Sequence, residues 1–282
     1  MDLIVDAFEP AFMQRALLGG LVAVVATSLV GTWVVLRGLA FLGDALAHGV
    51  VPGIALAMLW GFSPIIGAFV AALVMGGLVS VVSNRTLVRE DTAIGLLFVG
   101  MLSLGIVIVS RARSFSTEVT SLLFGDVLGV TGADIRNQIV ATIVVLSATV
   151  LFYRPFLALK FNRAKAQTLG MHPGRTQAVL LALLALSIVA SFQAIGTLLV
   201  FGLLVGPPAT ASLLVRRIPA IMIVSMLLGA VAVVAGLLVS FHHGTAGGAT
   251  IAGFSVLQFF VVLVGREIHA ALRPTGPAPI AV

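Results

Sequence analysis

The sequence predicts an all-α, polytopic membrane protein, and two observations carry this prediction. Of its 282 residues, 60% are hydrophobic and only 9% are charged, whereas a soluble domain has roughly a quarter of its residues charged. The apolar residues gather in windows of spanning length, about 17–25 residues. These windows lie at 14–36, 41–59, 64–83, 93–110, 136–153, 176–193, 196–215, 219–240 and 250–266. Because several are short or rich in glycine, we expect eight to nine transmembrane helices in one domain over residues 1–282.

The positive charges predict the orientation of these helices. Cytoplasmic loops carry the excess of Lys and Arg. Most of the 16 Lys and Arg residues fall in alternate loops: Arg37, Arg85, Arg89, Arg154, Lys160, Arg163, Lys165, Arg175, Arg216, Arg217, Arg266 and Arg273. The remainder are Arg15, Arg111, Arg113 and Arg136. We therefore expect a multi-pass protein of the cell membrane with a cytoplasmic C-terminus. The formal charge of +6 then reflects topology and not binding to nucleic acid.

Two ionisable residues in the second window, Asp44 and His48, are the candidate site. Residues four apart on a helix share one face, and ionisable groups within a membrane are costly and usually functional. A carboxylate and an imidazole are suitable ligands for manganese, iron or zinc. One chain supplies two such ligands, and a second copy related by a two-fold axis would supply four. The alternatives are a self-neutralising Asp–His pair that serves packing, and a proton relay.

Other candidate residues point to different chemistry. The chain has no cysteine, so any metal site must use His, carboxylate or backbone oxygen. His242 and His243 lie in a predicted outer loop and are weaker candidates for metal contact. Gly43-Asp44 and Gly125-Asp126 invite comparison with intramembrane aspartyl proteases, but Asp126 is predicted to lie in an outer segment. The chain lacks a Walker A motif, so ATP-driven transport would need a separate ATPase chain.

Four segments depart from simple spans or short loops. The longest predicted cytoplasmic loop, about 154–175, contains an amphipathic stretch at 161–169 that would lie on anionic lipid or dock on a cytoplasmic partner. The outer segment 120–131 is apolar and predicts a half-helix, since irregular backbone at membrane depth must be covered by protein or line a cavity. Gly206, Pro207 and Pro208 interrupt a later window, either as a break or as a kink accommodated by packing. The tail at 273–282 is rich in proline.

These motifs resemble the permease subunits of manganese and zinc ABC importers. The most distinctive is Phe-Leu-Gly-Asp-Ala-Leu-Ala-His at 41–48, within a matching segment at 41–55. Further matching segments follow in order at 91–95, 122–131, 166–170, 193–200 and 206–211, and the resemblance covers residues 12–265.

The resemblance implies a fold related to the vitamin B12 and siderophore importers. It implies a working unit of two permease copies, two ATPase subunits that hydrolyse ATP and an extracytoplasmic metal-binding protein. The family's pathway residues fall on Asp44 and His48. Its ATPase-coupling segment falls on Ala164, Lys165, Ala166, Gln167, Leu169 and Gly170. Its outer half-helix, or gate, falls on Phe124, Gly125, Asp126 and Gly129.

One departure from the family pattern concerns the last outer loop. The family often has an acidic residue and a proline where this chain has Gly244 and Ala246, next to His242 and His243.

Taken together, the sequence features predict a permease that is not itself an enzyme. We expect its cargo to be Mn²⁺ or Zn²⁺, with Fe²⁺ as the next candidate. The alternative is an ion-coupled secondary carrier that uses Asp44 and His48 as a proton relay. A remote alternative is an intramembrane aspartyl protease.

Overall fold

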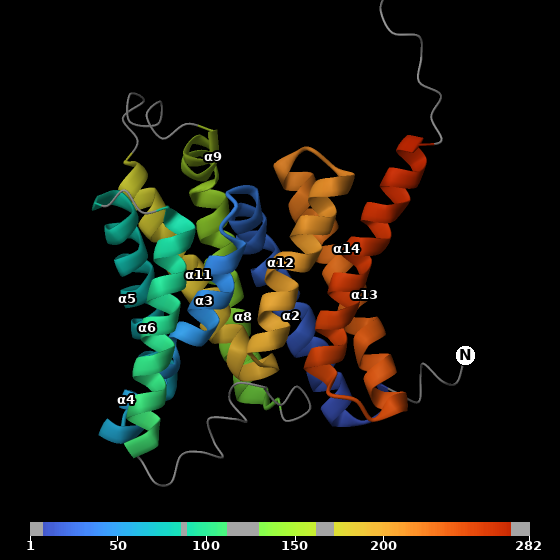
Figure 1. The fold of residues 1–282 in the computed structure, drawn as a ribbon. Helices are drawn as coiled ribbons and strands as arrows, with labels where there is room; N and C mark the ends of the chain where they lie inside the picture. The colour runs from blue at the N-terminus through green and yellow to red at the C-terminus, as the bar shows by residue number, and fades with distance from the viewer. Residues whose placement is uncertain (1–7, 86–88, 112–129, 162–171, 272–282) are drawn as a thin grey trace, which may run out of the picture.

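The computed structural model describes residues 8–85, 89–111, 130–161 and 172–271, and the secondary structure in these ranges is helical throughout (Figure 1). The helices are α2 (Ala11–Leu36), α3 (Ala40–Gly49), α4 (Val51–Trp60), α5 (Pro64–Arg85), α6 (Glu90–Arg111), α8 (Gly132–Leu151), α9 (Tyr153–Phe161), α11 (Pro173–Ile195), α12 (Thr197–Leu214), α13 (Ile218–His243) and α14 (Gly247–Ala271). The all-α prediction is confirmed.

The predicted windows correspond to the observed helices. Among the described residues, eight helices are long and apolar enough to cross a membrane, with α3 and α4 together forming one span at Ala40–Trp60. The remaining window falls on α12, whose apolar part, Leu198–Leu214, is shorter. The prediction of eight to nine spans is therefore confirmed: eight helices meet the spanning length, and α12 would be the ninth.

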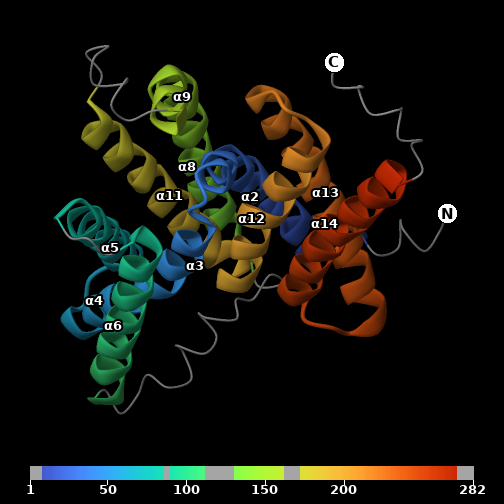
Figure 2. The same cartoon turned by 45° about the horizontal axis from the view of Figure 1, so that its top comes forward.

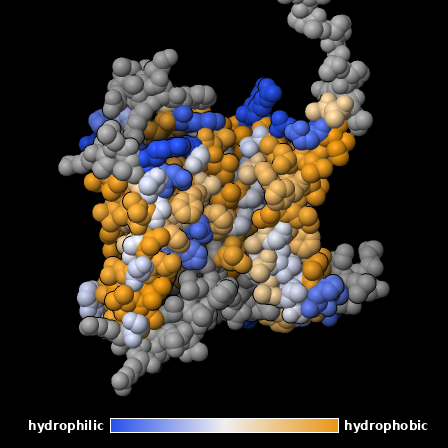
Figure 3. Space-filling view, in the orientation of Figure 1, coloured by the Kyte–Doolittle hydropathy of each residue, from blue (hydrophilic) through white to orange (hydrophobic). Residues whose placement is uncertain are grey.

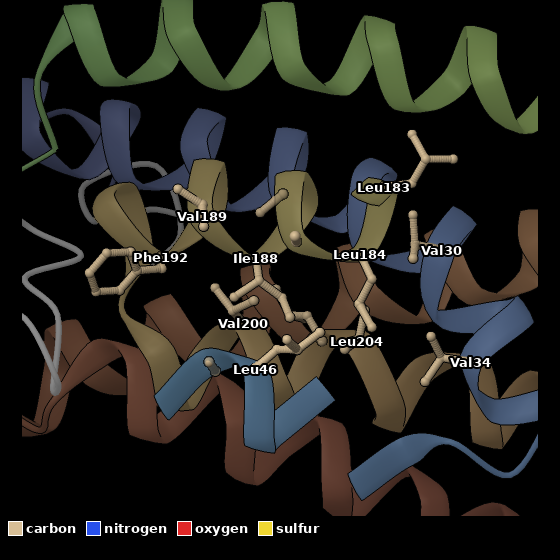
Figure 4. Packing of buried hydrophobic residues seen from close by; sticks show 14 of the residues in the cluster. Val30, Val34, Leu46, Leu183, Leu184, Ile188, Val189, Phe192, Val200 and Leu204 are labelled. Carbon is tan, nitrogen blue, oxygen red and sulfur yellow. The ribbon is translucent and has the colours of Figure 1, made fainter. Parts of the chain in front are cut away.

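The core is built around α2, which lies between α8 and α11 on one side and α12 and α13 on the other (Figures 1 and 2). Of the most apolar stretch of α2, 72% is buried, against 17% for α6 and 22% for α14. Figure 4 shows the centre of this core, where Val30 and Val34 of α2 meet Leu184 and Ile188 of α11 and Leu204 of α12. Because apolar side chains also cover the outside of the molecule, the surrounding solvent is the hydrocarbon of a bilayer.

Glycine and alanine set the closest helix contacts. A Cβ on Gly53 of α4 would meet the carbonyl oxygen of Gly67 on α5, and would lie 2.6 Å from Cβ of Ala71. A Cβ on Gly67 would likewise meet the carbonyl oxygen of Gly53. Small residues of this kind allow membrane helices to pack backbone against backbone. The α4–α5 hairpin therefore has no room for a larger side chain at either glycine.

The two prolines of α12 do not break it. The helix runs continuously from Thr197 to Leu214 with Pro207 and Pro208 inside, so the alternative of a break at these prolines is wrong. The break lies before this helix, where Gly196 has φ of 82° and separates α11 from α12. Only glycine adopts this backbone conformation readily.

Among the described residues, those that carry the predicted cytoplasmic charges lie at one end of the bundle. In Figure 1 this end, at the top, holds the α2–α3 and α12–α13 connections, the end of α5, the start of α6, α9, the start of α11 and the end of α14. Figure 3 shows hydrophilic surface along this end and an apolar band below it. We call this hydrophilic end of the bundle the basic end. Residues 120–129 of the predicted half-helix and residues 162–170 of the coupling segment lie outside the described residues.

Candidate metal pathway

The candidate site lies immediately before a break in the second span. Pro52 lacks the N–H that a continuous helix would donate to the carbonyl of His48, and α3 ends at Gly49. The N–H of Val50 donates to the His48 carbonyl in its place, and α4 resumes at Val51. The break therefore places Asp44 and His48 on the last two turns of a short helix inside the membrane span.

The two side chains form a loose pair on the surface of the chain. Nε2 of His48 lies 3.5 Å from Oδ1 of Asp44, and the side chains are 33% and 29% exposed, respectively. By contrast, Leu42, Ala45 and Leu46 of the same helix are buried. A small hydrophilic patch lies over α3 within the apolar band (Figure 3). Asp44 and His48 therefore face outward from a single chain at membrane depth.

Aromatic contacts hold one side of the imidazole ring. The ring of Phe98 on α6 lies 6.0 Å, edge to face, from the ring of His48, and 6.1 Å from the ring of Phe41 on α3. On the other side of α3, a Cβ on Gly43 would meet the side chain of Leu204 on α12. The sequence analysis did not identify Phe98, because one aromatic residue in an apolar span carries no pattern that separates it from the rest.

Within the described residues, no group of three or more His, Asp or Glu side chains lies close enough to hold a metal ion. Asp44 and His48 thus offer two ligands from one chain. A site with four ligands needs further groups from another chain, from water or from segments outside the described residues.

His242 and His243 lie far along the chain, at the end of α13. Nδ1 of His242 is 2.8 Å from the carbonyl oxygen of Leu238, and Nδ1 of His243 is 3.2 Å from that of Val239. Both residues are exposed. Gly244 ends the helix with φ of 63°. The structure does not bring these histidines together with Asp44 and His48 into one ligand group.

Two other sets of predicted site residues cannot be placed. The gate residues Phe124, Gly125, Asp126 and Gly129 lie outside the described residues. So do the coupling residues Ala164, Lys165, Ala166, Gln167, Leu169 and Gly170. Their roles stay predictions.

The fold and the site define an all-helical, multi-pass membrane protein with an ionisable pair beside a break in one span. Residues 9–266 match the ABC 3 transport family, and the chain belongs to this family. The family predicted from the motifs is therefore confirmed.

Individual relatives cover nearly the whole chain. The manganese transport system membrane protein MntC of Listeria monocytogenes is 32% identical over 254 residues, which is 90% of each chain. The chelated iron transport system membrane protein YfeD of Yersinia pestis is 34% identical, over 95% of this chain and 90% of that protein. The solved structure of PsaBC from Streptococcus pneumoniae in complex with Fab has a chain that is 30% identical. It superposes with a TM-score of 0.82, over 92% of this chain and 94% of that one.

Proposed function

We propose that this chain is the membrane permease of an ABC importer for a divalent transition metal, with Mn²⁺ as the first candidate and Zn²⁺ and Fe²⁺ next. The observation that carries the proposal is the Asp44–His48 pair, about one-third exposed at membrane depth beside a helix break. The ABC 3 family match supports ABC-driven transport. Relatives that act in manganese and chelated iron transport support a transition metal as cargo.

The spacing of the pair suits a shared metal ion. For tetrahedral Zn²⁺, ligand distances of about 2.0–2.2 Å place two ligand atoms about 3.4 Å apart. Octahedral geometry brings them to about 3 Å. The observed separation between Nε2 and Oδ1 is 3.5 Å, so either geometry needs only a small side-chain movement. The separation alone does not select the metal.

The outward direction of the pair supports a site shared between two permease copies. A second copy facing the first across a two-fold axis would add its own carboxylate and imidazole, which makes four ligands. Both pairs would then be enclosed between two apolar faces, and metal could pass between them. Cargo transfer would depend on how the two copies move relative to one another.

We further propose that this movement is driven by a cytoplasmic ATPase that docks on the coupling residues at 164–170. ATP is hydrolysed on that partner and not on this chain. An extracytoplasmic metal-binding protein delivers the ion to the opposite end. The excess of Lys and Arg at the basic end supports a cytoplasmic location for this end and for the C-terminus.

Elemental mass spectrometry of whole cells tests the function. Cells that lack their own importers would express this chain, its ATPase and its binding protein, and the contents of Mn, Zn and Fe would be measured. We expect one metal to rise, and Asp44→Asn or His48→Gln to abolish the rise while the complex still assembles. Glu267→Gln and His269→Gln are the matched controls, because both residues are exposed on α14. Normal uptake by both site variants would refute the pathway.

A further inference from the structure

We infer that a groove between α8, α9 and α13, at the basic end, binds an anionic phospholipid. Its acyl chain would lie in the groove and its phosphate would meet Arg154 and Arg217. This site is separate from the metal pathway on α3, and it does not depend on the proposed cargo.

The groove exists because α2 separates two helices that do not close over it. α2 packs against both α8 and α13, and Figure 2 shows it between them. The resulting cavity has a volume of about 380 Å³. Leu29 of α2 forms the floor and is 4% exposed. The other lining residues are Thr149, Val150, Tyr153, Pro219 and Met222.

The lining is apolar apart from two hydroxyl groups. Thr149 is 2% exposed, and its Oγ1 has no hydrogen-bond partner in the described structure. A buried hydroxyl without a partner is unfavourable, and rotation of the side chain about Cα–Cβ would let this one donate into the groove. An ester carbonyl of a phospholipid would accept that bond while its acyl chain covers Leu29 and Met222.

Positive charge lies beside the upper end of the groove. Arg154 follows the lining residue Tyr153, and Arg216 and Arg217 precede the lining residue Pro219; all three arginines are exposed. Within α2, α8, α9 and α13, Asp134 is the sole acidic residue, and it lies at the opposite end of α8. Basic pockets between membrane helices on the cytoplasmic side recognise anionic headgroups. The charges therefore favour an anionic lipid over a zwitterionic one.

A natural fluorophore lies next to the groove. Trp33 is one turn beyond Leu29 on α2, so the two residues share a face. Trp33 is fully buried, and the centroid of its ring system lies 5.6 Å from that of Tyr153, which lines the groove. The other tryptophan of the chain, Trp60, is 72% exposed. In a Trp60→Phe variant, quenching by a brominated acyl chain would report on lipid near Trp33.

The experiment uses the full chain with Trp60→Phe in phosphatidylcholine bilayers. Phosphatidylglycerol or phosphatidylcholine with brominated acyl chains is titrated in, and Trp33 fluorescence is recorded. Each arginine near a headgroup contributes about fivefold in affinity. We therefore expect brominated phosphatidylglycerol to reach half-maximal quenching at a membrane fraction about 25-fold lower than brominated phosphatidylcholine.

Two double variants separate the groove from the general charge of the basic end. Arg154→Gln with Arg217→Gln should abolish the preference for phosphatidylglycerol. Arg89→Gln with Arg175→Gln removes as much charge from exposed positions at the same end and should leave the preference intact. Equal quenching by the two lipids in the Trp60→Phe chain with all its arginines, or equal loss of preference in both double variants, would overturn the inference. Thr149→Val should weaken quenching by both lipids about fivefold, and unchanged quenching would refute the hydroxyl contact.

Discussion

Replacing Gly67 with alanine would test the close approach of α4 and α5, which holds the helix that follows Asp44 and His48. The added Cβ would meet the carbonyl oxygen of Gly53 and would lie 2.7 Å from Cβ of Ala57. Neither neighbour is the end of a flexible side chain, so the two helices must separate. Overpacking of this kind costs about 1–3 kcal/mol.

Gly77 of the same helix provides a matched control. Nothing lies within 4 Å of a Cβ added there, and the position is exposed. Alanine at an unstrained helical position stabilises by about 0.4–1 kcal/mol, because it restricts the unfolded chain. The same chemical change therefore has opposite signs at two positions 10 residues apart, and the expected difference between the variants is about 1.4–4 kcal/mol.

The assay is thermal unfolding of the purified chain in one detergent, followed by loss of helical circular dichroism. Gly67→Ala should lower the midpoint and Gly77→Ala should leave it unchanged or raise it. Equal midpoints for the two variants would show that the contact between Gly53 and Gly67 is not as close as the structure has it.

Two further predictions concern packing and coupling. Ser255→Ala should destabilise the protein by about 1 kcal/mol, because Ser255 Oγ on α14 donates a hydrogen bond to the carbonyl of Gly202 on α12 at 2.9 Å. The control Ser225→Ala removes a buried hydroxyl without a partner in the described structure, so it should cost less in the same thermal assay. A larger loss of stability in Ser225→Ala than in Ser255→Ala would contradict the contact. Alanine substitutions at Gln167 and Leu169 should leave ATP hydrolysis intact but stop uptake, and normal uptake per ATP hydrolysed would remove these residues from the coupling role.

Much of the fold was predictable because bilayer thickness restricts it. A window such as 219–240 can hardly be anything but a span, and the structure has α13 there. The alternation of basic loops likewise predicted which connections share an end. The window at 196–215 likewise corresponds to α12, which runs from Thr197 to Leu214. What composition could not supply was that Pro207 and Pro208 lie inside a continuous helix and do not break it.

The candidate pair was predictable from its chemistry and spacing, but its surroundings were not. Charge in an apolar window marked Asp44 and His48, and helical spacing placed them on one face. The break after Gly49 has a signal in the sequence, since Pro52 removes the hydrogen bond to the carbonyl of His48, but hydropathy alone predicts one uninterrupted span at 41–59. The contact with Phe98 depends on how α6 packs against α3, and local sequence does not encode that.

The glycine at position 244, where the family often has an acidic residue, also has a local explanation. Gly244 adopts a left-handed conformation, with φ of 63°, and Asp and Asn are the other residues that visit this region. The acidic residue that the family often has there is therefore compatible with the same turn. The turn geometry thus does not require a carboxylate, and the chain can replace it with glycine.

The most direct test of the central claim, that the metal is held by Asp44 and His48, is electron paramagnetic resonance of Mn²⁺ bound to the purified, assembled transporter. Pulsed measurements detect the hyperfine coupling of Mn²⁺ to a ligating imidazole nitrogen. The coupling should be present in the unsubstituted protein, lost in His48→Gln, and retained in a His242→Gln, His243→Gln double variant. Retention in His48→Gln with loss in the double variant would contradict the account and assign the metal to the end of α13.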